Sequence, residues 1–221
     1  MTAHGSRAPS DSPLDYWNTV GPGKDFAHPI DIERFSRWVP KDARVLDYGC
    51  GYGRGVSALH SHGYTQVAGV DPASGMIAAA RERHPDLDFQ LLEHPPHVPA
   101  AGGAFDAALL VAVLTCVPSD SSQIGLVGEL NRVVRSGGVL HIADFWLQGD
   151  RRNLERYERT RPPGAPYGTF TLPEGIVLRH HSRAWIDQLT ESYELLSLDE
   201  VTVRTMNGHE ARGFHWYGRR P

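Results

Sequence analysis

The chain has 221 residues, of which 40% are hydrophobic, enough for one large domain with a sizeable core. Its formal net charge is −4 and it has no long Lys/Arg run. Nucleic acid is therefore a poor candidate partner, because phosphate binding needs a basic face. No run approaches the ~20 apolar residues that cross a membrane.

Residues 1–13 are polar and lack the apolar stretch of a signal peptide, so we predict a disordered tail ahead of a single domain over 14–221. Two cysteines, Cys50 and Cys116, are too few for a disulfide framework and indicate reduced thiols in the cytoplasm. The 12 histidines show no HExxH motif and no paired Cys/His spacing, so we expect no metal site. A monomer and a homodimer both stay open.

The segment from residue 44 to 145 alternates short apolar runs with stretches of helical periodicity. We predict strands over 44–48, 66–71, 87–92, 105–113 and 138–145, and helices over 53–62, 74–84 and 121–135. Gly137 and Gly138 indicate a helix stop that leads into the last of these strands. Strands that alternate with helices favour a parallel sheet with helices on both faces.

The C-terminal part has a different pattern. Two predicted strands, 195–206 and 211–218, flank Asn207-Gly208, a strong hairpin signal because both residues tolerate positive φ. An insertion over 146–181 precedes them. We expect it to contain a charged helix over 149–160 and a small hairpin of residues 169–172 and 176–178, followed by a helix from Ser182. Such an insertion above a sheet can shape a pocket.

An acidic residue and three alternate glycines follow the first predicted strand, in the run Asp47-Tyr48-Gly49-Cys50-Gly51-Tyr52-Gly53. Glycines at this spacing let the backbone bend sharply and approach a ligand closely, whereas an ordinary strand-to-helix turn explains only one of them. The dinucleotide pattern G-x-G-x-x-G fails, because Arg54 stands three positions beyond Gly51.

This run resembles the first motif of the class I S-adenosylmethionine-dependent methyltransferases. The resemblance continues at Asp71, which ends the second strand, at Phe105-Asp106, which opens the fourth, and in the helix, turn and strand from Glu129 to Leu140. It implies a Rossmann-like, doubly wound α/β sheet of seven strands, mostly parallel, with a C-terminal antiparallel hairpin and helices on both faces. It also implies S-adenosylmethionine as the cofactor.

The resemblance assigns cofactor contacts position by position. Asp47 and the glycine loop would hold the methionine end, and Asp71 would accept both ribose hydroxyls. Glu93 or His94 would meet the adenine amino group. The remaining expected contacts belong to the loop, border the adenine or pass near the sulfonium: Gly49, Cys50, Gly51, Arg54, Pro72, Ala73, Met76, Val111, Ala112 and Thr115.

Residues 14–40 precede the first strand, mix aromatic residues with glycines and are predicted to form a lid. Tyr16, Trp17, Lys24 and Phe26 are expected to contact the cofactor, since an aromatic face attracts the sulfonium cation. In the alternative interpretation, Tyr16 and Trp17 only anchor an N-terminal helix on the core.

The candidate catalytic groups are identified only by their positions in the sequence. Asp144 ends the fifth predicted strand, at the edge where ligands bind in such sheets. His181, next to His180, precedes a helix, and Tyr167 lies in the insertion. Each could act as a general base, although residues of these types in such positions are more often structural. Methyl transfer also proceeds without a base when the acceptor is already basic and well positioned.

We therefore expect methyl transfer to a small metabolite. A second hypothesis is a cyclase that closes the cofactor's own methionine amine onto its γ-carbon, giving azetidine-2-carboxylate and methylthioadenosine; this reaction needs a closed aromatic pocket and no acceptor site. A third is a non-catalytic S-adenosylmethionine-binding module.

Overall fold

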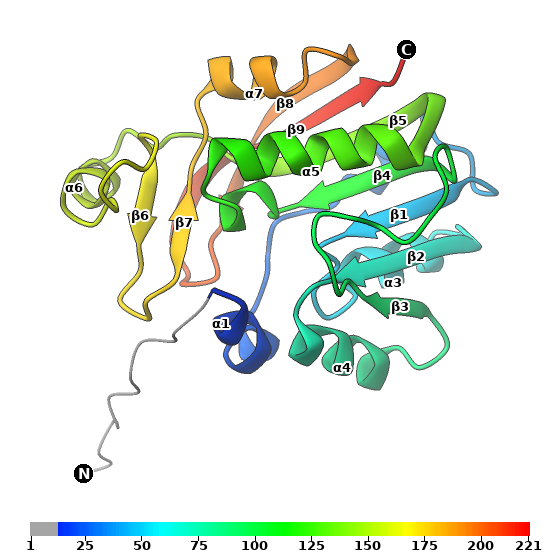
Figure 1. The fold of residues 1–221 in the computed structure, drawn as a ribbon, viewed down its shortest axis with the longest axis horizontal. Helices are drawn as coiled ribbons and strands as arrows, with labels where there is room; N and C mark the ends of the chain where they lie inside the picture. The colour runs from blue at the N-terminus through cyan, green and yellow to red at the C-terminus, as the bar shows by residue number, and fades with distance from the viewer. Residues whose placement is uncertain (1–12) are drawn as a thin grey trace.

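The computed structural model describes residues 13–221 (Figure 1). The tail predicted over 1–13 lies outside this range, except that Pro13 begins the first helix, α1 (Pro13–Thr19). No helix within 13–221 is long and apolar enough to cross a membrane.

Seven strands form one sheet in the order β3-β2-β1-β4-β5-β9-β8. Five of them pair in parallel: β1 (Arg44–Tyr48), β2 (Gln66–Asp71), β3 (Asp88–Leu91), β4 (Phe105–Val111) and β5 (Val134–Phe145). β9 (Glu210–Arg219) runs antiparallel both to β5 and to β8 (Glu194–Arg204). The predicted doubly wound, mostly parallel sheet with its terminal antiparallel hairpin is confirmed.

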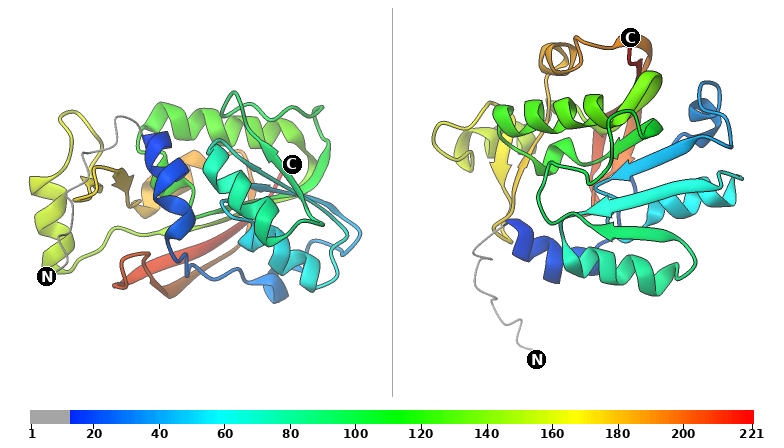
Figure 2. Two further views of the ribbon diagram at one scale, coloured as in Figure 1. Left: turned by 90° about the horizontal axis from the view of Figure 1, so that it is seen from below. Right: turned by 45° about the vertical axis from the view of Figure 1, so that its right-hand side comes forward.

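Helices cover both faces of this sheet (Figure 2): α5 (Asp120–Val133) and α7 (Arg183–Leu189) lie on one face, and α2 (Ile32–Phe35), α3 (Arg54–Ser61) and α4 (Ser74–Arg83) on the other. Successive residues of a strand point to opposite faces. Accordingly, Leu46 and Leu110 belong to the cluster with α5 and α7, whereas Val45 and Leu109 pack with α2 and α3. Both faces of the central strands are thus buried, as in other parallel sheets.

The boundary between α5 and β5 corrects one prediction. The sequence predicts a helix to residue 135 and a strand from 138, but α5 ends at Val133 and β5 begins at Val134. Val134 pairs with Phe105, and backbone hydrogen bonds from Gly137 to Arg220 and from Arg220 to Gly138 hold the glycines against the end of the chain. The glycine pair is therefore part of the strand and not a helix stop.

The insertion over 146–181 contains α6 (Arg151–Arg159) and a separate two-stranded sheet of β6 (Thr169–Thr171) and β7 (Val177–Arg179). It lies beyond the carboxyl ends of β4 and β5, close to α1 (Figure 1). Tyr16 of α1 is buried in one cluster with Tyr157, Phe170 and Leu178 of the insertion. Two segments far apart in the sequence therefore pack on each other at the edge of the sheet where ligands bind in such folds.

Candidate functional site

The loop after β1 contains three glycines with positive φ: 72° at Gly49, 55° at Gly51 and 88° at Gly53. A Cβ on Gly49 would lie 2.5 Å from Val113, and one on Gly53 would lie 2.5 Å from Phe89, so both glycines permit close packing. A Cβ on Gly51 would meet nothing within 4 Å. The middle glycine therefore faces open space, and its backbone is accessible to a ligand.

Asp47 is buried at the end of β1, against the first turn of α3. A Cβ on Gly55 would collide with its Oδ2 atom, so glycine at that position lets the helix approach the carboxyl group. Burial raises the pKa of Asp47 to about 7, while the positive charge of Arg54 opposes the shift. A cationic ligand group near Asp47 would favour its ionised form for the same electrostatic reason.

Asp71 ends β2 and connects this strand to the glycine loop. Its Oδ2 accepts a hydrogen bond from the Gly51 backbone N–H at 2.9 Å, and its Oδ1 accepts one from Ala73 at 2.8 Å. Burial raises the pKa of Asp71, and these two hydrogen bonds oppose the shift. Each carboxylate oxygen has a second lone pair, so Asp71 can still accept hydroxyl groups of a ligand.

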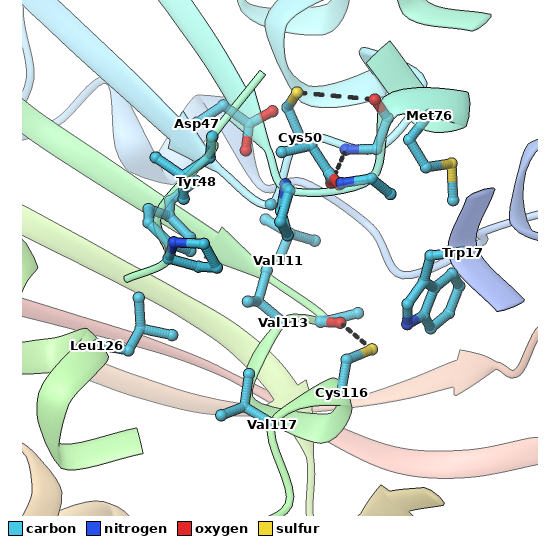
Figure 3. Close-up of a pocket in the computed structure, with 18 of the residues that line it drawn as sticks. Trp17, Asp47, Tyr48, Cys50, Met76, Val111, Val113, Cys116, Val117 and Leu126 are labelled. Carbon is cyan, nitrogen blue, oxygen red and sulfur yellow. Dashed lines mark hydrogen bonds between the residues drawn. The ribbon is translucent and has the colours of Figure 1, made fainter. Parts of the chain in front are cut away.

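A cavity of about 850 Å³ opens at the carboxyl ends of β1, β2 and β4. Figure 3 shows a pocket with Asp47, Cys50, Met76, Val111 and Trp17 around it. Trp17 and Phe26 have ring centroids 6.0 Å apart, and Phe26 stacks on Tyr52 at 5.3 Å. These three residues, which all line the cavity, form what we call the aromatic wall. Such a wall excludes water and attracts a cation.

A second cavity of about 840 Å³ lies beyond the first, and the two meet at Trp17, Phe26, Ala112 and Cys116, which line both. Ala112 has a φ of 56°, a left-handed conformation that ends β4 two residues before the predicted boundary at 113. The walls of the second cavity come from the N-terminal segment, the insertion and the turn between β8 and β9. Lys24 joins these three segments, because its Nζ lies 3.4 Å from Glu174 and 3.3 Å from Asn207.

Comparisons with known proteins agree with this architecture. The family model described as a methyltransferase domain matches residues 46–142. The chain is 32% identical to the demethylmenaquinone methyltransferase of Beutenbergia cavernae over 157 residues, which are 67% of this chain and 57% of that protein. It is 29% identical to the ubiquinone biosynthesis O-methyltransferase of Xanthomonas axonopodis over 178 residues, 77% of this chain and 69% of the relative.

A solved S-adenosylmethionine-dependent methyltransferase from Methanosarcina mazei has the same fold, with a TM-score of 0.80 and 22% identity over 87% of this chain and 98% of that one. The chain belongs to the class I S-adenosylmethionine-dependent methyltransferases. It spans a little more than half the length of the relative from Beutenbergia cavernae, at 57%.

S-adenosylmethionine is the cofactor of this family, and the first cavity fits it. The open space at Gly51 leaves room for a ligand against the backbone, and the carboxyl groups of Asp47 and Asp71 can accept hydrogen bonds from an ammonium group and from hydroxyls. The aromatic wall suits a sulfonium cation.

Most of the cofactor contacts expected from the sequence line the first cavity. They are Trp17, Phe26, Asp47, Gly49, Cys50, Gly51, Arg54, Asp71, Pro72, Ala73, Met76, Glu93, Val111 and Ala112. At the adenine position, Glu93 lines the cavity and His94 does not. Whether each of these residues contacts the cofactor stays a prediction.

Four expected contacts lie outside the first cavity. Tyr16 is buried against the insertion, Lys24 pairs with Glu174, and His94 is exposed beside the cavity. Thr115 lines the second cavity. Tyr16 is thus buried as an anchor would be, whereas Trp17 packs beside the same cluster and lines both cavities. A lid role for Trp17 stays a prediction.

Some residues that line the first cavity were not expected from the sequence. Asn18 accepts a hydrogen bond from Gly75 N–H at 3.0 Å and one from Ser74 Oγ at 3.2 Å, so it connects α1 to the start of α4. Further lining residues that the sequence did not single out include Leu14, Ile30, Tyr48, Leu92, Pro95, Pro96 and Cys116. Of these, Tyr48 had a sequence signal, since it directly precedes the first loop glycine.

None of the three predicted catalytic residues lines either cavity. Asp144 is fully buried, and its two oxygens accept backbone hydrogen bonds from Phe145 at 2.8 Å and Thr115 at 3.1 Å. Tyr167 is 45% exposed and lines neither cavity. His181 is buried, 2.9 Å from the Gln123 amide, and 3.7 Å from Asp144. These positions suit structural roles, and catalytic roles for the three residues stay untested predictions.

His180 is the histidine of the pair that faces the second cavity. Its Nδ1 lies 2.6 Å from the Tyr157 hydroxyl, and its ring stacks on Phe145 with centroids 5.5 Å apart. Burial holds the pKa of His180 well below its usual value, and the charge of Arg156 adds to this effect. His180 is therefore a neutral imidazole that can accept or donate a hydrogen bond in the cavity.

Cys50 and Cys116 line the first cavity, and both are free thiols. Burial raises the pKa of each thiol well above its ordinary value. Since the thiolate is the reactive form, both thiols should be weak nucleophiles at neutral pH.

Proposed function

We propose that this protein transfers the methyl group of S-adenosylmethionine to a small molecule held in the second cavity. The observation that carries this proposal is the junction of the two cavities at Ala112 and Cys116. An acceptor in the second cavity would approach the cofactor site from the side of the aromatic wall. The cyclase hypothesis needs no acceptor site, so a second cavity of about 840 Å³ favours transfer.

The chain's own residues orient, enclose and desolvate the reactants. Bound S-adenosylmethionine supplies an electrophilic methyl group. Asp71 and the Gly51 backbone would fix the position of the cofactor, and Trp17 and Phe26, which line both cavities, would exclude water and stabilise positive charge. Because the adjoining cavities would hold the two reactants together, positioning is expected to supply much of the rate enhancement. His180, held as a neutral imidazole, can form a hydrogen bond with a hydroxyl acceptor.

The walls of the second cavity limit the size of the substrate. The second cavity is enclosed by the N-terminal segment, the insertion and the β8–β9 turn, which Lys24 links to one another. A volume of this order suits a metabolite and not a macromolecule. The relatives named for quinone biosynthesis are consistent with a small organic acceptor.

The test is to incubate the purified protein with methyl-labelled S-adenosylmethionine, with and without a small-molecule extract filtered below ~1 kDa. Transfer predicts S-adenosylhomocysteine and a labelled product only when the extract is present. Methylthioadenosine from the cofactor alone would replace this proposal with cyclisation. Cofactor binding with neither product, over extracts from several organisms, would favour the binding module.

A further inference from the structure

The second cavity has an excess of positive charge. Its lining contains three arginines, Arg152, Arg156 and Arg204, and a single carboxylate, Glu174. Lys24 pairs with Glu174 at 3.4 Å, so that carboxylate already has a cationic partner. Within residues 13–221, none of the three arginines has a carboxylate within 4.0 Å. The cavity therefore attracts anions.

Arg156 is the half-buried member of this group. Its guanidinium lies 3.5 Å from the centre of the Phe170 ring, and its Nη2 lies 3.4 Å from His180 Nε2. The Tyr157 side chain also interacts with the guanidinium; none of these three neighbours is a carboxylate, and the Arg156 Nε is buried without a hydrogen-bond partner. Burial lowers the pKa of Arg156 to about 10, which leaves it cationic at neutral pH. A half-buried cation without an anionic partner is unfavourable, and an anion in the cavity would stabilise it.

Helical spacing places Arg152 on the same face as Arg156. Residues 152, 156 and 160 are four apart on and just after α6, and all three line the cavity. Arg151 and Glu155, on another face, form an exposed ion pair. The helix thus presents two arginines that lack a carboxylate partner, Arg152 and Arg156, to the cavity.

The other walls decide which anion fits. Phe145, Phe170, Leu172, Leu178 and Met206 make much of the lining apolar. A phosphate is close to doubly charged and requires several donors, whereas one guanidinium can hold a carboxylate through two parallel hydrogen bonds. The start of α6 cannot serve a phosphate either, since the Asp150 carboxylate caps it.

We propose that Arg156, with Arg152 beside it, binds a carboxylate of the methyl acceptor, and that the acceptor is a small organic acid with an apolar body. That the bound acid is the methyl acceptor rests on the proposed function, whereas the carboxylate site itself can be tested by binding alone. The apolar body would lie against Phe145, Leu178 and Met206. The atom to be methylated would then point toward the junction at Ala112 and Cys116.

The experiment compares acids with their uncharged primary amides of the same shape: benzoate, 3-phenylpropanoate and octanoate. Binding is measured by calorimetry in the presence of saturating S-adenosylhomocysteine. At least one acid should bind about 10- to 100-fold more tightly than its amide, the range expected for a hydrogen-bonded charged group. The variant Arg156→Gln should lose this preference, and Arg156→Lys, which keeps the charge without the planar fork, should retain part of it.

The matched control is Arg159→Gln, on the same helix, exposed and outside both cavities. It removes the same charge and should keep the preference. Affinity for S-adenosylhomocysteine, measured first, should be the same in all variants, which verifies that they are folded. Equal binding of every acid and its amide, or an unchanged preference in Arg156→Gln, would overturn the proposal. Tighter binding of phenyl phosphate than of every acid would overturn the carboxylate assignment.

The two proposals fail separately. If S-adenosylhomocysteine does not bind, the proposed function fails, and the preference for acids is then measured on the protein alone. If methyl transfer is found but only to neutral or cationic molecules, the proposed function stands and the carboxylate site is overturned.

Discussion

Gly51 differs from the other glycines of its loop in what surrounds it. Gly49 and Gly53 have protein atoms within 2.5 Å of the Cβ position, whereas Gly51 has none within 4 Å. Replacing Gly49 or Gly53 would therefore disturb packing. Replacing Gly51 tests whether a ligand needs the open space beside the loop. The strain of a side chain at positive φ is a separate effect.

Gly51→Val should abolish binding of S-adenosylhomocysteine, because a branched side chain would occupy the open space next to the loop. Gly63→Val is the matched control, since Gly63 also has a positive φ, of 87°, and also has nothing within 4 Å, but lies outside the cavity. Both variants should lose about 1–2 kcal/mol of unfolding free energy through backbone strain. Calorimetric binding by Gly51→Val with wild-type affinity would contradict this account of the loop.

Asp144 allows a prediction that separates a structural role from a catalytic one. In Asp144→Asn the new amide NH₂ faces a backbone N–H of Thr115 or Phe145, so we expect a loss of about 1.5–3 kcal/mol of unfolding free energy. Turnover per folded molecule should change little. A stable variant whose turnover falls by about 10²-fold or more would instead identify Asp144 as a general base.

For single residues, the sequence predicts the motif positions well and the orientation of other side chains near the cavities poorly. The carboxyl groups of Asp47 and Asp71 are marked by their places at strand ends. The sequence does not show which of His180 and His181 faces the second cavity, because adjacent residues in an extended segment point in opposite directions. The bridge between His181 and Trp146 fixes which of the pair turns inward to Gln123.

Among the elements, α1 packs unusually closely on α4. A Cβ on Gly75 would collide with the backbone oxygen of Asn18, and one on Gly21 would lie 2.5 Å from Met76. The Asn18 side chain also accepts from the Gly75 N–H. The position of α1, and with it that of Trp17, therefore depends on the absence of a side chain at Gly75.

Gly75→Ala should displace α1 and lower affinity for S-adenosylhomocysteine, by about tenfold for the loss of roughly one hydrogen bond and its contacts. Gly128→Ala in α5 is the control, because a Cβ there meets nothing within 4 Å. That change should leave affinity unchanged and raise unfolding free energy by about 0.5–1 kcal/mol through helix propensity. Equal affinities in the two variants would show that α1 does not shape the cofactor site.

The elements themselves were largely predictable, since their apolar periodicity is strong and their ends are marked by turn residues. The α5–β5 boundary was not, because Gly137-Gly138 has the local signature of a helix end. Its strand conformation depends on Arg220, more than 80 residues later in the chain. Long-range partners of this kind leave no local signal.

For the whole molecule, buried titratable groups set the response to pH. Burial lowers the pKa of His28 to about 4 and of His181 to about 3, and also lowers those of three more: His141, His180 and His215. Their contribution to stability is complete above their unfolded pKa near 6.5 and is lost as pH falls toward the folded values. Asp47 and Asp144, with pKa values raised to about 7, have the opposite effect: they stabilise below about 3.8 and lose that contribution as pH rises to 7.

Five histidines outnumber the carboxyl groups with raised pKa, which are Asp47, Asp71 and Asp144. We therefore expect unfolding free energy, measured with urea, to fall as the pH is lowered from 6.5 to 5. Each uncompensated histidine contributes about 1.4 kcal/mol per pH unit. His141→Phe, which keeps a ring stacked on Tyr217, should reduce this slope by about one histidine's contribution. Equal or greater stability at pH 5 would contradict the expectation.

The two cavities were not equally accessible to prediction. The first is built by consecutive strand ends and a glycine motif, so one stretch of sequence encodes most of it. The second is built by three segments, 17–28, 145–180 and 204–209, with only Ala112, Thr115 and Cys116 from between them. Arginines at i and i+4 in α6 were visible in the sequence, but nothing local shows that they face a cavity.

The place of β9 in the sheet bears on how the chain folds during synthesis. β9 lies between β5 and β8, yet the ribosome makes it after every other strand. Until residues 210–219 have emerged, β5 and β8 each have an unpaired edge, and unpaired edges promote association between chains. The first cavity requires only strands that are already complete by then. Binding of the cofactor to the nascent chain is thus a route by which the N-terminal half could be held native while it waits for its last strand.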